Sequence, residues 1–130
     1  MTLPVTLCAA AAAAVLNIWL MARIASLRGK LGILHGDGEH PPLLRRMRAQ
    51  ANFIESAPLV LILSGLIEAS GKAYPRLPFV LALYLLGRVA HMFGMDRETS
   101  ARPRTVGAIV TLLTLGGLSL TAVLIAAGAI

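Results

Sequence analysis

Charged and amide side chains lie at helical spacing at the start of one long apolar run. Arg45, Arg48, Asn52 and Glu55 are separated by three, four and three residues, so on a helix they share one face. Arginine guanidinium groups match carboxylates in a fork of two hydrogen bonds, and a lone carboxylate suits an ammonium group. This helix face could therefore bind a small ligand that carries carboxylates and one amine.

The elements that must position this face are membrane-length helices. The chain has 130 residues, of which 57% are hydrophobic and 14% charged, and its mean hydropathy is +0.77. This composition is too apolar for an ordinary soluble domain. Four windows approach the roughly 20 apolar residues that cross a bilayer, namely residues 3–22, 43–69, 77–95 and 106–130. We therefore predict an all-α integral membrane protein, in which residues 1–130 form one bundle of four transmembrane helices.

The first window has the length of a secretory signal peptide, but it lacks the basic segment that precedes the apolar part of such peptides and runs into Arg23. We expect it to be a retained first span. Lysine and arginine are concentrated between the first and second spans and between the third and fourth. Because basic residues accumulate on the cytoplasmic side, both connections should be cytoplasmic and both termini outside. The net charge of +6 is then explained without nucleic acid, and anionic lipid or an anionic cytoplasmic ligand is the better partner.

Two further polar stripes repeat the helical spacing. One consists of Tyr84, Arg88, His91 and Met95, and the other of Asn17, Met21, Ile24 and Arg28. An ionisable group inside a span costs about 2.5–3.5 kcal/mol, so Glu55 and Arg88 should face protein or water and be paired. One interpretation is a buried Glu55–Arg88 pair that only fixes helix packing. The other is an anionic ligand, because four arginines (45, 48, 88 and 104) share one leaflet, and Glu55 is the only nearby acid inside the spans.

Two other groups of polar residues have simpler interpretations. His35, Asp37, Glu39 and His40 match no strong zinc spacing and lie in a glycine-rich loop, so we predict no metal site. Ser100 and Thr105 are expected to cap the fourth helix rather than act as nucleophiles. For Thr105 a role beside the site stays open.

Three segments resemble those of one membrane family. The block "RRMRAQANFIESAP" contains the pattern R-A-x-x-N-x-x-E, matched by Arg48, Ala49, Asn52 and Glu55. "GRVAHMFGM", residues 87–95, is similar to the third-helix segment of the same family, and "RPRTVG", residues 102–107, to the entry of its fourth helix. On these motifs the chain is identified as a member of the MAPEG family, membrane-associated proteins in eicosanoid and glutathione metabolism. The G-D-G loop resembles bacterial members, which implies a bacterial inner membrane.

The resemblance implies a homotrimer that binds glutathione between neighbouring subunits near the cytoplasmic face. Glu55 would take the amino group of glutathione and Arg48 a carboxylate, while Arg104 would stabilise the thiolate beside Thr105. The remaining implied contacts to glutathione are Arg28, Gln50, Asn52, Arg88, His91 and Met95. Two positions depart from the family pattern: Met95 stands where several members have tyrosine, and Ser56 follows Glu55 where the leukotriene synthase has another.

A glutathione-dependent transferase or peroxidase is the function that follows. A thiol is mostly protonated at neutral pH, and an adjacent guanidinium favours the reactive thiolate. That thiolate would attack a hydrophobic electrophile dissolved in the membrane lipid, or reduce a lipid hydroperoxide, with proximity as a main catalytic term. The alternative is a non-catalytic membrane helix bundle whose polar stripes serve assembly or bind another anion.

Overall fold

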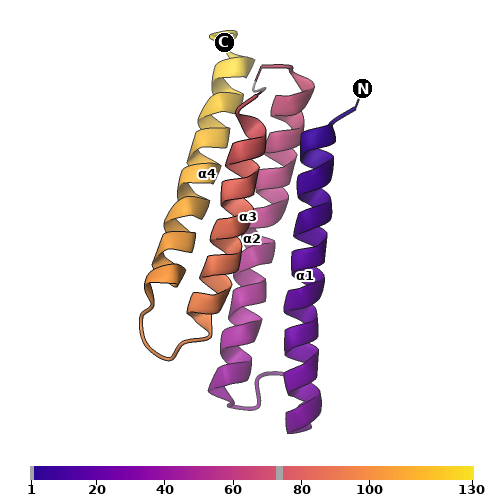
Figure 1. Ribbon diagram of the computed structural model, residues 1–130, viewed down its shortest axis with the longest axis vertical. Helices are drawn as coiled ribbons and strands as arrows, with labels where there is room; N and C mark the ends of the chain where they lie inside the picture. Colours follow the sequence, from indigo (N-terminus) through magenta and orange to yellow (C-terminus); the bar gives the residue numbers. More distant parts are fainter. Residues whose placement is uncertain (1, 73–74) are drawn as a thin grey trace.

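The computed structural model describes residues 2–72 and 75–130, and within them the chain folds into four long helices (Figure 1). They are α1 (Pro4–Leu31), α2 (Pro41–Ala69), α3 (Leu77–Met95) and α4 (Arg102–Ala126). Each helix has a proline in its first turn, where the missing backbone N–H would have had no helical partner. The helices run up and down, so the α1–α2 and α3–α4 connections share one end, named here the basic end. The α2–α3 connection and both termini lie at the opposite end.

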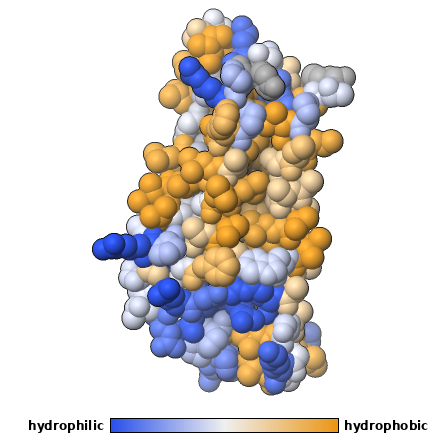
Figure 2. All heavy atoms as spheres, in the orientation of Figure 1, coloured by the Kyte–Doolittle hydropathy of each residue, from blue (hydrophilic) through white to orange (hydrophobic). Residues whose placement is uncertain are grey.

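All four helices are long and apolar enough to cross a membrane, which confirms the predicted fold class. Many large apolar side chains point outward, as expected for a surface in contact with lipid. Figure 2 shows these residues as an apolar band, with a hydrophilic region below it toward the basic end. The chain is therefore an all-α integral membrane protein.

Two helices differ in length from their predicted windows. α1 continues to Leu31, and it ends only where Gly32 adopts a left-handed conformation with φ of 68°. Arg23, Arg28 and Lys30 consequently lie on the helix, beyond the apolar window, and for Arg28 this agrees with the polar stripe predicted on the first helix. α4 likewise begins at Arg102 rather than near residue 106. Hydropathy windows end where charges begin, whereas a helix continues until its backbone is interrupted.

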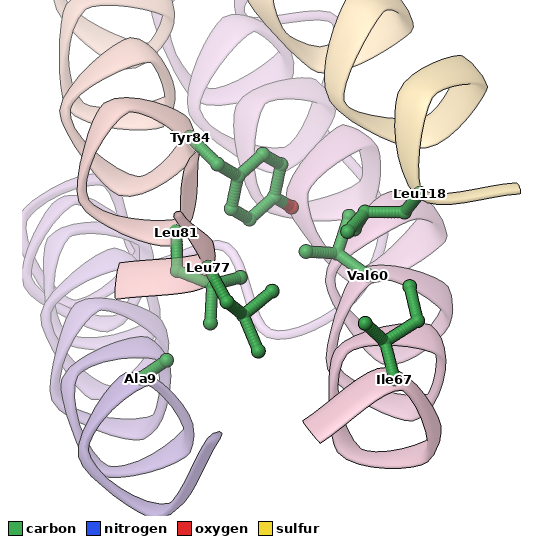
Figure 3. Packing of buried hydrophobic residues seen from close by; sticks show 7 residues of the cluster. All are labelled: Ala9, Val60, Ile67, Leu77, Leu81, Tyr84 and Leu118. Atoms are coloured by element: carbon green, nitrogen blue, oxygen red, sulfur yellow. The ribbon is translucent and has the colours of Figure 1, made fainter. Parts of the chain in front are cut away.

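The bundle core lies between all four helices. In Figure 3, side chains from each helix point toward one another, and Tyr84, Val60 and Ile67 are among the most completely buried. A second cluster, nearer the middle of α1, contains Leu20, Phe53 and Met92. These apolar contacts set the rotation of α2 and α3, and with it the direction of their polar faces.

Glycines bring α3 and α4 close together toward the basic end. A Cβ atom on Gly107 would lie 2.5 Å from the His91 Cβ and would also clash with the Gly87 carbonyl oxygen. A Cβ on Gly94 would collide with the backbone of Arg104. Small residues allow such close approach in membrane bundles. The start of α4 is therefore pressed directly onto the end of α3.

Polar contacts attach α1 at both of its ends. At the opposite end, the Glu68 carboxylate accepts hydrogen bonds from the backbone N–H groups of Val5 (2.9 Å) and Thr6 (2.8 Å). At the basic end, Arg23 forms an ion pair with Asp96, and Arg46 donates to the Arg23 carbonyl oxygen at 2.6 Å. These contacts restrict how far α1 can move relative to the other helices.

Candidate functional site

A small cavity of about 120 Å³ opens where α2, α3 and α4 meet toward the basic end. Its walls carry one acidic, two basic and several neutral side chains. They are Arg48, Ala51, Asn52, Glu55, His91, Met95 and Arg104. The polar face predicted on α2 is thus brought together with the third-helix stripe and the arginine at the start of α4.

The three charged residues of this cavity have no partner within the described chain. Among residues 2–72 and 75–130, the side chains of Arg48, Glu55 and Arg104 make no ion pair or hydrogen bond, and all three are exposed. The interpretation of a buried Glu55–Arg88 pair is therefore wrong. Arg45, the first member of the α2 face, instead lies 3.7 Å from Glu98 in an ion pair outside the cavity.

Arg88 is buried behind the cavity, with 2% of its surface exposed. Its Nη2 donates to the Asn52 Oδ1 at 2.7 Å, and its Nη1 donates to the Thr111 Oγ1 at 3.1 Å. The Thr111 hydroxyl in turn donates to the Gly107 carbonyl oxygen at 2.9 Å. The guanidinium thus joins α2, α3 and α4 through side chains. Thr111 was not among the predicted site residues, although it lies seven residues after Arg104 and therefore shares its helix face.

His91 fixes the position of Arg104 through the backbone. The His91 Nδ1 lies 2.9 Å from the Arg104 carbonyl oxygen, so this ring nitrogen carries the proton and donates it. With Gly94 packed under the same backbone, the first turn of α4 has a defined place beside the cavity. The Arg104 side chain itself is left free to meet a ligand.

The two positions that depart from the family pattern lie in different surroundings. The Ser56 and Tyr84 hydroxyls lie 2.8 Å apart in the interior, where Tyr84 is 1% exposed. This tyrosine faces Ser56 in the core and does not line the cavity. Met95 does line it, so at this point the wall presents a thioether instead of a hydroxyl.

Three of the predicted site residues lie away from the cavity of their own chain. Gln50 donates to the Asn17 Oδ1 at 3.3 Å, on the side of α2 that faces α1. Arg28 contacts the Ile33 carbonyl oxygen at 3.5 Å and the Met47 sulfur at 3.4 Å. Thr105 is exposed on the first turn of α4. A ligand in this cavity would meet these side chains only if a neighbouring copy supplied them.

The predicted capping of α4 is wrong. Its N-cap residue is Ala101, which has no side-chain hydrogen-bonding group, and neither Ser100 nor Thr105 bonds the exposed backbone in its place within the described residues. Proline at position 103 already removes one donor, which reduces the need for a cap.

In the part of the chain that the structure describes, no group of three or more His, Cys, Asp or Glu side chains is arranged to hold a metal ion.

The model of the MAPEG family matches residues 6–124, almost the whole chain. The chain belongs to the MAPEG family. A search of curated protein sequences finds no match. MAPEG membership agrees with the four spans, and it is consistent with a membrane glutathione-dependent transferase or a related function. The three motifs that carry the resemblance fall on α2, α3 and α4, the helices that line the cavity.

Proposed function

We propose that this MAPEG protein is a membrane-bound glutathione-dependent transferase or peroxidase. The observation that carries the proposal is the cavity at which Arg48, Glu55 and Arg104 stand without intrachain partners, inside a bundle that spans the membrane. Because these side chains are exposed and unpaired within the described chain, a ligand or a neighbouring subunit can bind them without breaking an intrachain contact. An anionic ligand with one amine could pair its acidic groups with the two guanidinium groups and its ammonium group with the carboxylate.

Glutathione fits this set of donors and acceptors. Glu55 would accept hydrogen bonds from its ammonium group, and Arg48 would bind one of its carboxylates. The Asn52 oxygen is already occupied by Arg88, so its Nδ2 would donate to the ligand. A second carboxylate calls for a further cation, and Arg28 of a neighbouring subunit is the candidate.

The reaction depends on charge stabilisation at one atom. Bound glutathione supplies a thiol, which is nucleophilic only when ionised. The Arg104 guanidinium, held in place by His91 and Gly94, would favour that ionised form and direct it toward the bilayer. Thr105 on the same helix turn would add a hydroxyl contact. The second substrate would be a hydrophobic electrophile or a lipid hydroperoxide that arrives through the membrane lipid.

We propose that the protein assembles as a homotrimer, and the incomplete site supports contact with a further copy of the chain. A volume of about 120 Å³ is below the 300–1,000 Å³ typical of ligand sites. Arg48, Asn52, Glu55 and Arg104 are all open on one chain, so a second copy placed against α2 would close the site. We propose that the basic end faces the cytoplasm of a bacterial cell, in its inner membrane, where the excess of lysine and arginine belongs.

The deciding experiment is an ultraviolet thiolate difference titration of the detergent-purified protein with glutathione. A saturable thiolate band that is lost in Arg104→Ala and kept in Arg102→Ala supports the proposal. Arg102 is a matched control, because it is an exposed arginine on the same turn that does not line the cavity. If there is no band and glutathione does not raise the melting temperature, a non-catalytic bundle that serves assembly or binds another anion is favoured instead.

A further inference from the structure

A second and larger hollow lies between α3 and α4 toward the opposite end of the bundle. It has a volume of about 660 Å³ and is walled mainly by apolar side chains, among them Leu77, Val80 and Leu83 of α3 and Leu113 and Leu118 of α4. None of the residues around it belongs to the cavity described above. It is named here the α3–α4 groove.

The groove has the length of one membrane leaflet. Along α4 its wall extends from Val110 to Thr121, which corresponds to about 16 Å of helix. The hydrocarbon core of a bilayer is about 30 Å thick, so the groove covers about half of it. The contacts at Gly94 and Gly107 hold the two helices together at the basic end, and the groove opens beyond them. An extended acyl chain has the shape that fits this space.

Basic side chains lie at the mouth of the groove. Lys72 and Arg76 line it at the opposite end, where the α2–α3 connection meets the membrane surface, and both are exposed. Among the described residues, Glu68 is the acidic side chain of this end, and both of its oxygens accept hydrogen bonds from the first turn of α1. Neither basic residue has an ion-pair partner in the described chain. Two cations above an apolar slot match a phosphate above an acyl chain.

We propose that the α3–α4 groove binds one phospholipid with an anionic headgroup. The acyl chain would lie against α3 and α4, and the headgroup phosphate would sit between Lys72 and Arg76. Surface lysines and arginines attract anionic lipid at a membrane interface, and the apolar walls remain in contact with hydrocarbon. This site is independent of the proposed glutathione chemistry, since the two hollows share no residue.

Two neighbouring glycines on α4 allow a matched test of the acyl site. Gly117 lines the groove and Gly116 does not, and a Cβ atom would meet nothing within 4 Å at either position. Gly117→Leu should therefore narrow the groove, while Gly116→Leu should leave it open. The measurement is native mass spectrometry of the delipidated full chain with added palmitoyl-oleoyl phosphatidylglycerol. The Gly117→Leu variant should lose the tightly held lipid, and Gly116→Leu should keep it.

Substitutions that remove positive charge test the headgroup site. Wild-type protein should retain phosphatidylglycerol in preference to phosphatidylcholine with the same acyl chains. Lys72→Gln with Arg76→Gln should reduce that preference about tenfold. Lys30→Gln with Arg97→Gln removes the same charge at exposed positions of the basic end and should leave the preference unchanged.

Three results would overturn the proposal. The first is equal retention of the two lipids by wild-type protein, and the second is unaltered phosphatidylglycerol binding in Gly117→Leu. The third is a change in the mass of the assembly in Gly117→Leu, because it would mean that a second copy of the chain occupies the groove. Circular dichroism and thermal unfolding of each variant distinguish loss of the lipid from loss of the fold.

Discussion

Arg88 and Asn52 join α3 to α2 through a hydrogen bond of 2.7 Å between Nη2 and Oδ1. Because a guanidinium can only donate, this contact assigns the oxygen of the Asn52 amide to the protein interior and its nitrogen to the cavity. A buried cation therefore determines which group a residue of the candidate site can offer to a ligand. Arg88 acts in the site through its neighbours, since it does not line the cavity.

We predict that Thr111→Val lowers the free energy of unfolding by about 1–3 kcal/mol, because it leaves the buried Arg88 Nη1 without an acceptor. The same change should cost little when Arg88 is already Met, since no donor then remains to be satisfied. Thermal or chemical unfolding of the four proteins measures this coupling. Thr121→Val is the control, because that exposed hydroxyl bonds only the Gly117 carbonyl oxygen of its own helix. Equal costs of Thr111→Val in both backgrounds would contradict the prediction.

Glu55→Gln should weaken glutathione binding about tenfold and leave folding stability unchanged. The carboxylate is exposed and has no partner within the described chain, so its loss affects only the ligand. An analogue of glutathione that lacks the amino group should bind wild type and Glu55→Gln equally. Isothermal titration with both ligands makes the comparison. If the variant discriminates against the analogue as strongly as wild type does, Glu55 does not bind the ammonium group.

Gly107→Ala should destabilise the protein by about 1–3 kcal/mol. The new methyl group would collide with the Gly87 carbonyl oxygen and with the His91 Cβ, so α3 and α4 would have to separate. Gly116→Ala introduces the same methyl group into open space on the same helix and should stabilise it slightly. Melting temperatures in detergent compare the two. A Gly107→Ala protein as stable as wild type would show that the glycine contact is not required.

Glu68→Gln should loosen the start of α1. The carboxylate accepts hydrogen bonds from the Val5 and Thr6 amides at a helix N-terminus, where negative charge is favourable. Hydrogen exchange of these two amides should become several-fold faster, and exchange in α3 should not change. Glu98→Gln is the control, because Glu98 is 83% exposed and pairs only weakly with Arg45 at the other end. Unchanged exchange at residues 5 and 6 would exclude the cap.

Much of the fold could be predicted because membrane spans have a strong compositional signal. The four helices follow from hydropathy, and helical spacing places Arg48, Asn52 and Glu55 on one face, where the structure has them around one cavity. The length of α1 was underestimated, because Arg23 ends the apolar window although the helix continues past it to Gly32. Composition indicates which part of a helix contacts lipid, whereas the end of the helix itself is set by an interruption of its backbone.

The partners of the polar residues were harder to predict. Spacing tells which residues share a face, but the rotation and axial offset between helices decide which faces meet. One of the two interpretations paired Arg88 with Glu55, whereas the glycine contacts between α3 and α4 bring it to Thr111. A hydrogen-bond acceptor on another helix leaves no signal in the sequence around Arg88. The separation of Gln50 from the cavity, by contrast, follows from helical spacing, because a residue two positions from both Arg48 and Asn52 points away from their face.

The glycine contacts between α3 and α4 also have a mechanical consequence. The two helices are held backbone to backbone beside the candidate site, and they are separated by the groove at the far end. A change in bilayer thickness or lateral pressure should therefore be absorbed where the helices can still tilt. The arginine at the start of α4 should keep its position while the distant half of the helix adjusts. The candidate site is in this way insulated from variation in the membrane around it.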